Sequence, residues 1–136
     1  MAIKSYDLDG VIHLNGGGVG LRPSGPEDVI ITGRSEKERQ RTEDWLAENE
    51  IQNEVFFSPD PFSANWREQG GKHKTETIMR LWSEGREVLI HFEDDPIQAD
   101  MIRKGTAAHV ALIDHGGRMR PPSRKIRLPR KRGLKI

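Results

Sequence analysis

The chain has 136 residues, 34% of them hydrophobic and 32% charged, which suits one domain with a single core. Without cysteine or a run of eighteen apolar residues, disulfides, thiolate metal sites and a membrane-spanning helix are excluded, and without a signal-peptide pattern we expect a cytoplasmic protein. The net charge of +1 hides an asymmetry: residues 1–115 carry 13 Lys/Arg against 21 Asp/Glu, net −8, and residues 116–136 carry nine Lys/Arg and no acid, net +9. We therefore expect a folded domain over 1–115 and a basic, flexible tail over 116–136.

The first predicted element is a short buried strand within Ile3–Val11 that ends at two aspartates. Positions i and i+2 of a strand point the same way, so Asp7 and Asp9 would face one spot. Gly10 follows at once and allows a sharp turn and the close approach of a ligand. The pattern favours binding of a cation and presentation of an oxygen nucleophile, although a plain polar turn has the same residues.

Strands and helices then alternate along the chain. Residues 11–22 flank a glycine cluster and predict a small hairpin or a mobile flap. Thr32 and a turn at Gly33 are expected to end the second strand, and Ser35 to cap the helix that follows. The predicted strands are 28–34, 53–57, 87–92 and 109–113, the predicted helices are about 35–49, 73–84 and 96–104, and 58–71 is a predicted loop.

This alternation of short apolar strands with helices predicts an α/β fold, a three-layer sandwich around a five-stranded, mainly parallel sheet. Ligands of such sheets bind beyond the carboxyl ends of the strands. Here those ends carry Asp7/Asp9, Thr32 and the run Glu93-Asp94-Asp95. Unit charges about 4 Å apart repel by roughly 4 kcal/mol at an effective dielectric near 20, so the acids must protonate or bind a cation. Oxygen ligands without cysteine favour Mg²⁺.

A lysine at the expected start of the second helix, Lys72 or Lys74, would add positive charge beside the acids. A site with Mg²⁺, a hydroxyl, a lysine and a carboxylate suits phosphoryl transfer. With these residues, the chain resembles the haloacid dehalogenase-like (HAD) phosphohydrolases. The four motifs that carry the resemblance are Asp7-Leu8-Asp9-Gly10-Val11, Thr32-Gly33-Arg34, the helix lysine and the acidic run after Phe92, and they span residues 1 to about 115.

The resemblance implies a role for each matching residue. Asp7 would be the nucleophile that forms an aspartyl-phosphate, and Asp9 the general acid/base. Thr32, Gly33, Arg34 and Lys74 would hold the phosphoryl group, with Lys74 fitting the family spacing better than Lys72. Asp7, Asp9, Asp94 and Asp95 would bind Mg²⁺, with Asp94 as the main ligand, while Glu93 would orient the site or face away. The implied strand order is 5-4-1-2-3.

The short intervals between these motifs leave no room for a cap domain, so the chain is similar to capless members that act on phosphomonoesters through an open site. A weaker similarity points to the phosphatase half of polynucleotide kinase-phosphatases, and hence to nucleotide or polynucleotide ends. The basic residues of 116–136 could contact nucleic acid phosphates. The alternative function is a non-catalytic nucleic-acid-binding protein on the same scaffold, and the sequence does not separate a hydrolase from a phosphotransferase.

Overall fold

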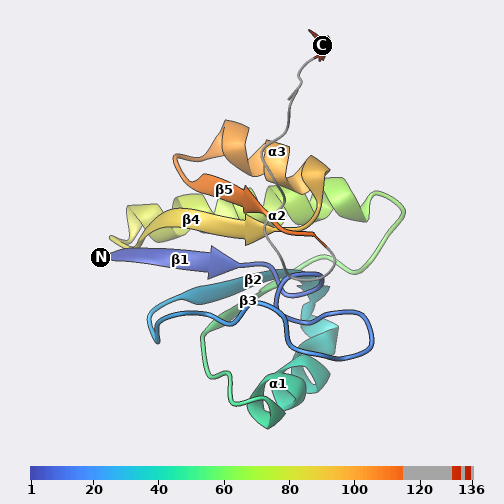
Figure 1. Cartoon of the computed structure of the whole chain (residues 1–136), viewed down its shortest axis with the longest axis vertical. Coiled ribbons are helices and arrows are strands. Elements are labelled where there is room, and N and C mark those ends of the chain that lie inside the picture. Colours follow the sequence, from blue (N-terminus) through green and yellow to red (C-terminus); the bar gives the residue numbers. More distant parts are fainter. Residues whose placement is uncertain (115–129, 133, 136) are drawn as a thin grey trace.

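The computed structural model describes residues 1–114, 130–132 and 134–135. Five strands form one parallel sheet in the order β3-β2-β1-β4-β5 (Figure 1). This confirms the α/β fold and the strand order expected from the resemblance. The strands are β1 (Ala2–Tyr6), β2 (Val29–Ser35), β3 (Val55–Ser58), β4 (Glu87–Glu93) and β5 (His109–Leu112).

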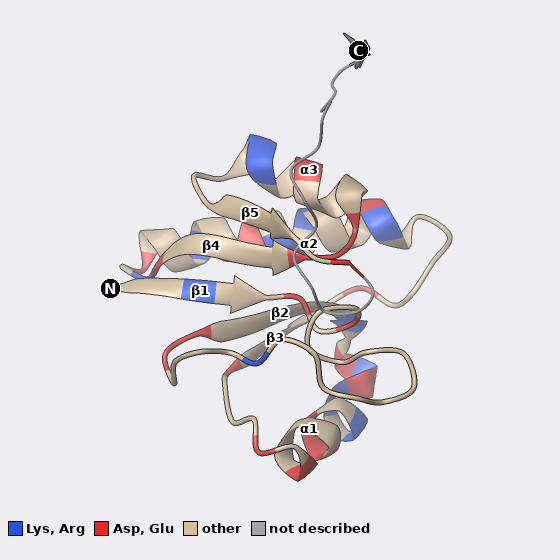
Figure 2. Cartoon of the chain, viewed as in Figure 1, with Lys and Arg blue, Asp and Glu red and all other residues tan. Residues whose placement is uncertain are grey.

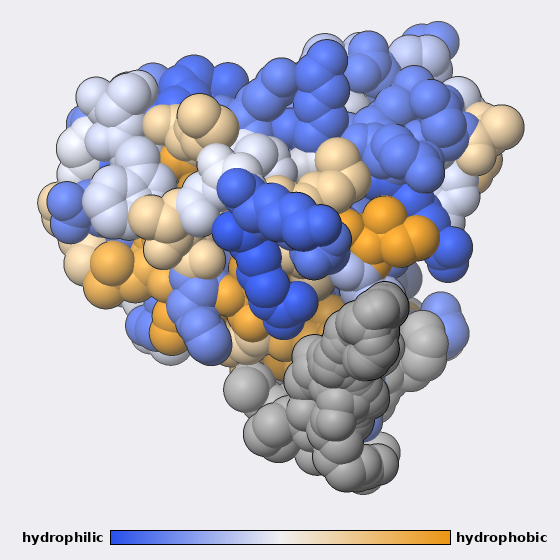
Figure 3. Space-filling model, turned by 90° about the horizontal axis from the view of Figure 1, so that it is seen from above, coloured by the Kyte–Doolittle hydropathy of each residue, from blue (hydrophilic) through white to orange (hydrophobic). Residues whose placement is uncertain are grey.

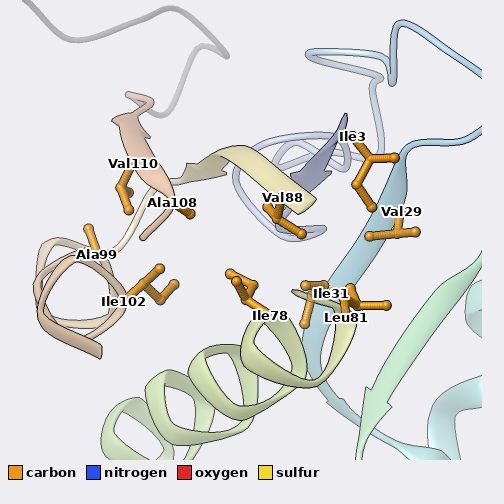
Figure 4. Close-up of a cluster of buried hydrophobic side chains, with 10 residues drawn as sticks. All are labelled: Ile3, Val29, Ile31, Ile78, Leu81, Val88, Ala99, Ile102, Ala108 and Val110. Atoms are coloured by element: carbon orange, nitrogen blue, oxygen red, sulfur yellow. The ribbon is translucent and has the colours of Figure 1, made fainter. Parts of the chain in front are cut away.

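Helices pack on both faces of the sheet. On one face, α2 (Trp66–Ser83) and α3 (Pro96–Gly105) bury a cluster that includes Ile78, Leu81 and Ile102 (Figure 4). On the other face, a 3₁₀ turn (Glu36–Glu38) leads into α1 (Arg39–Glu48), and Leu46 packs with Tyr6 and Ile30. Residues 1–114 hold no further domain, as expected for a chain without a cap.

In the basic tail, β6 (Arg130–Arg132) and β7 (Leu134–Lys135) form a separate antiparallel pair. The rest of the predicted flexible tail, residues 116–129, 133 and 136, lies outside the described residues, as does residue 115. Among the residues that the structure describes, no helix is long and apolar enough to cross a bilayer. Hydrophilic residues cover much of the face seen in Figure 3, and hydrophobic residues are exposed between them.

Two predicted boundaries are wrong. Gly33 does not end β2 in a turn, because the strand continues to Ser35, whose hydroxyl then caps the 3₁₀ turn at Lys37 N. Helix α2 begins at Trp66, seven residues before the predicted start, so part of the expected loop is helical. The misleading signal is Gly70-Gly71, which lies inside α2 where a Cβ would overlap the side chains of Gln98 and Met101 on α3. These glycines let two helices approach closely.

Strand β4 carries one extra residue that sets which side chains face α2. Ile3 pairs with Val88, but Lys4 pairs with Ile90, so Leu89 is an irregularity in the β1–β4 ladder. Such a bulge reverses the alternation of the residues that follow it. Consequently Val88 faces the α2 side, and so do His91 and Glu93, which contact residues of β1 and α2 there.

The glycine-rich segment after β1 forms the predicted hairpin. Backbone bonds join Leu21 N to Val11 O, Gly20 N to Ile12 O and Leu14 N to Gly18 O. Val11 and Ile12 are fully buried and anchor the segment to the core beside α1. Together with the loop between β3 and α2, this hairpin projects beyond the strand ends (Figure 1).

Candidate acidic site at the carboxyl ends of the strands

Three carboxylates gather where β1 and β4 end. Asp7 directly follows β1, Glu93 is the last residue of β4 and Asp94 comes next. Acidic positions follow the arrowheads of both strands in Figure 2. One oxygen from each of the three residues lies within 4.8 Å of the others, which makes them a group able to hold a metal ion. The predicted convergence of β1 and β4 acids is therefore confirmed.

Lys74 supplies the positive charge of this group. Its ammonium lies 3.0 Å from Asp7 Oδ1, 2.9 Å from Glu93 Oε1 and 2.7 Å from Gln98 Oε1. These three acceptors match the three hydrogens of an ammonium, and the side chain is only 2% exposed. Burial lowers the pKa of Lys74, but the Asp7 and Glu93 charges outweigh it and raise that pKa above its usual value. Lys74 is thus a permanent cation.

One aspect of the lysine prediction is wrong. Lys74 is the ninth residue of α2 and not at its start, so the helix amino end does not add its dipole there. The alternative Lys72 is exposed, whereas Lys74 is buried against Asp7. The structure therefore brings Lys74, the preferred of the two, to the acidic group.

One lysine does not balance three carboxylates. Burial raises the pKa of Asp7 to about 7, and the neighbouring Glu93 charge adds to the rise while Lys74 opposes it. Burial also raises the pKa of Asp94 to about 7, with the Asp7 charge as the next cause. The group therefore takes up protons when no other cation is present. All donors are carboxylate oxygens, so the set fits a hard divalent ion such as Mg²⁺.

Behind the acids, Ser5 and His91 hold Glu93 in place. His91 Nε2 lies 2.9 Å from Glu93 Oε1, and His91 Nδ1 lies 2.7 Å from Ser5 Oγ. Burial lowers the pKa of His91 to about 3, with the Lys74 charge adding to the effect, so the ring is neutral. Because a carboxylate only accepts, Nε2–H donates to Glu93 and the Ser5 hydroxyl donates to Nδ1. All three residues are fully buried, which makes this chain of bonds structural.

Asp9 lies apart from the acidic group and pairs with Arg34. The guanidinium donates from Nε to Asp9 Oδ2 at 2.9 Å and from Nη2 to Oδ1 at 2.7 Å. Its third contact is Nη1 to the buried Thr42 hydroxyl at 3.0 Å. His13 Nδ1 lies 3.7 Å from Asp9 Oδ1, and its ring packs against Trp45. The pair is only partly exposed, with the Asp9 side chain 55% exposed and the Arg34 side chain 16% exposed.

Asp95 has a helix-capping position. Its Oδ1 accepts from Ile97 N at 2.9 Å at the start of α3, and Arg67 Nε lies 3.4 Å from Oδ2. The backbone N of Asp95 also donates to Glu93 Oε2 at 3.3 Å. Thr32 is buried in the middle of β2, and its hydroxyl accepts from Arg34 N at 3.1 Å. Their expected roles, metal binding for Asp95 and phosphoryl binding for Thr32, stay predictions.

Glu93 is the acid that the sequence interpretation placed at the margin of the site, yet it belongs to the group of three. A usable signal was present. Ser5 and Asp7 alternate on β1 in the same way as His91 and Glu93 on β4, and Ser5 pairs with His91 across the two strands. Two polar residues at i and i+2 on neighbouring strand ends indicate one shared polar face.

Gly10 is required by the contact that it makes. Its φ of +88° lies in the left-handed region, and a Cβ there would overlap the Asp94 carboxylate. Glycine therefore lets the turn after β1 approach Asp94 closely.

The acidic group opens into a cleft of about 690 Å³. Asp9, Gly33 and Arg34 line one side of it, and the β3–α2 loop lines another. The cleft is thus large enough for a small organic ligand.

Neither models of known protein families, nor curated proteins, nor solved structures gave a match to this chain. A parallel α/β sheet with a buried acidic group at β1, able to hold a metal ion, is what the molecule shows.

Proposed function

We propose that this chain is a Mg²⁺-dependent phosphomonoester hydrolase of the HAD type, with Asp7 as its nucleophile. The observation that carries the proposal is the placement of the Asp7 carboxylate. It lies at the end of the central strand, bonded to Lys74 at 3.0 Å and grouped with Glu93 and Asp94 at the base of an open cleft. A carboxylate nucleophile that lies beside cations, here Lys74 and the proposed metal ion, suits attack on an anionic phosphoryl group.

Asp7 is oriented for attack by bonds to one of its oxygens. Leu8 N donates to Oδ1 at 2.8 Å and Lys74 contacts the same atom. Oδ2 then attacks phosphorus and forms the Oδ2–P bond as the bond from phosphorus to the leaving oxygen breaks. Asp9 protonates that oxygen. Water next attacks phosphorus, Asp9 takes its proton, and inorganic phosphate and free Asp7 result.

Arg34 has two anionic partners available in this proposal. In the structure it bonds to Asp9. A dianionic phosphoryl group entering the cleft competes for the same guanidinium, since Arg binds both groups through a planar fork. Arg34 would then bind phosphate and leave Asp9 to carry the proton.

Asp7, Glu93 and Asp94 would hold the Mg²⁺. The bound ion would offset their mutual repulsion and polarise a phosphoryl oxygen. The raised pKa values of Asp7 and Asp94 support this placement, because they mark a group with excess negative charge.

A chelator-controlled assay tests the proposal. The full chain should release phosphate from an aryl phosphate with Mg²⁺, lose activity with EDTA and recover it with added Mg²⁺. Asp7→Asn should lose turnover by several orders of magnitude while keeping its fold by circular dichroism. Asp60→Asn, at the cleft wall, is the matched control. Turnover by Asp7→Asn at the original rate would contradict the proposal. No turnover by the intact chain would favour the alternative, a non-catalytic nucleic-acid-binding scaffold.

A further inference from the structure

Two aromatic rings stand at the rim of the same cleft, in and beside the β3–α2 loop. Phe62 is 80% exposed and Trp66 is 41% exposed. Their ring centroids lie 6.2 Å apart with the planes inclined by only 22°. Single exposed apolar residues are common, but two near-parallel rings lining one cleft with Asp7 form an aromatic platform.

This aromatic platform is fixed to the acidic site. Trp66 is the first residue of α2, and its backbone N donates to Ser63 O at 3.1 Å. The guanidinium of Arg67 lies 5.1 Å from the Trp66 ring centroid, and its Nε is 3.4 Å from Asp95 Oδ2. The Arg67 cation over the ring and its ion pair to Asp95 at the start of α3 hold Trp66 in position in the cleft.

The charge of the cleft restricts what can reach the aromatic platform. Among the described residues, the acids that line the cleft are Asp7, Asp9, Glu38, Asp60, Glu93, Asp94 and Asp95, and the bases are Arg34, Arg67 and Lys74. A long polyanion would meet seven carboxylates and three cations, so its successive phosphates would be repelled. A ligand with one phosphate group and an uncharged flat ring meets the cations at the base of the cleft and the aromatic platform at its rim.

We propose that Phe62 and Trp66 form a stacking subsite for a planar heteroaromatic ring in a small phosphomonoester, such as a nucleoside monophosphate. The inference rests on the proposed phosphatase function and narrows its substrate class. Aromatic stacking accepts any flat ring, so the subsite selects for the presence of a base and not for its identity.

Paired substrates test the subsite in the full chain with Mg²⁺. The preference in kcat/KM for adenosine 5′-monophosphate over ribose 5-phosphate should fall about tenfold in Phe62→Ala. Phe62→Leu should lose nearly as much, because it keeps apolar surface but not the ring. Met79→Ala, an equally simple truncation of an exposed residue on α2, is the control. An unchanged preference in both Phe62 variants would overturn the subsite.

Binding without turnover separates this inference from the proposed function. Asp7→Asn titrated with adenosine 5′-monophosphate should show quenching of tryptophan fluorescence, and Asp7→Asn/Trp66→Leu should lose that change. Saturable quenching that persists without Trp66 would overturn the subsite even if the chain is a phosphatase. If the unsubstituted chain shows no phosphatase turnover and the quenching still depends on Trp66, the stacking subsite stands and the phosphatase function is rejected. A 5′-phosphorylated oligonucleotide bound at least tenfold more tightly than the mononucleotide would overturn the restriction to small esters.

Discussion

Two ionic groups near the cleft, one around Lys74 and one formed by Asp9 and Arg34, differ in their access to water. Lys74 is 2% exposed and its acceptors Asp7 and Glu93 are buried with it. The Asp9 side chain is 55% exposed, and Arg34 contacts it from the cleft wall. Removal of one partner from a buried pair leaves a charge that water cannot reach, whereas an exposed pair exchanges partners at little cost. The buried group therefore fixes Asp7, the proposed nucleophile, and the Asp9–Arg34 pair can exchange partners when a ligand binds.

Removing the buried cation should have the largest effect. Lys74→Met would leave Asp7 and Glu93 without their shared partner, and we expect a loss of about 3–5 kcal/mol in the free energy of unfolding. Lys72→Met, two residues away on the exposed side of α2, should change it by less than about 0.5 kcal/mol. Urea unfolding of both variants measures the difference. Equal, small losses would show that the buried group does not support the fold.

Disturbing the close approach of the turn after β1 to Asp94 should have the second largest effect on stability. Gly10→Ala adds left-handed strain and an overlap with the carboxylate, so we expect a loss of at least about 3 kcal/mol and weaker Mn²⁺ or Mg²⁺ binding. Gly17→Ala has the same kind of φ, +90°, and open space around the added Cβ. It should cost about 1–2 kcal/mol from strain alone. Thermal unfolding and metal titration compare the two, and equal losses would argue against the Asp94 contact.

A change of pH perturbs the buried group more mildly than either substitution. The folded pKa values of Asp7 and Asp94, about 7, lie above the ordinary value of 3.8, so the folded state binds more protons between pH 4 and 7. The stability from these groups is complete below pH 4 and is lost as the pH rises through 7. The Tm of metal-free protein should therefore fall across this window. Mg²⁺ and Asp94→Asn should each flatten the fall, and a Tm that rises in chelator would contradict this charge balance.

The exposed pair should give the smallest change in stability. Arg34→Lys keeps the charge but loses the two-pronged contact with Asp9, and we expect a loss below about 1 kcal/mol in the free energy of unfolding. Arg41→Lys, in an exposed pair with Glu38, is the control for a purely superficial contact. Their phosphatase KM values should differ, because only Arg34 faces the cleft. A large destabilisation by Arg34→Lys would remove the contrast between the two groups.

Much of the fold follows from local sequence patterns, and the exceptions have identifiable causes. Short apolar strands separated by helices predicted the parallel sheet, and the Asp7 and Glu93–Asp95 strand ends predicted where acids meet. The start of α2 was missed because Gly70-Gly71 reads as a loop signal. Those glycines are required by the packing of Gln98 and Met101, which is a tertiary contact that lies outside any local window.

The site was predicted in outline: Asp7 and Asp94 were expected in it and lie in the group of three, whereas Glu93 was expected to orient the site or face away. The run of three carboxylates does not by itself show which of them meets Lys74, and the signal for Glu93 lies outside the run, in its alternation with His91. The ladder between β1 and β4 brings Glu93 to Lys74, and the first turn of α3 takes Asp95 as its cap. Asp9 was expected to face the same spot as Asp7, but β1 ends at Tyr6 and the chain turns from Leu8 onward, and Asp9 pairs with Arg34.

The single additional residue at Leu89 has a consequence for related chains. A relative lacking it would keep an uninterrupted alternation along this strand, with the residues that correspond to Val88, His91 and Glu93 still on the α2 side and the one that corresponds to Phe92 on the other. Such chains must therefore be aligned with a gap of one residue at Leu89, because an ungapped alignment on the acidic run would equate residues before the gap that occupy opposite sides of the sheet.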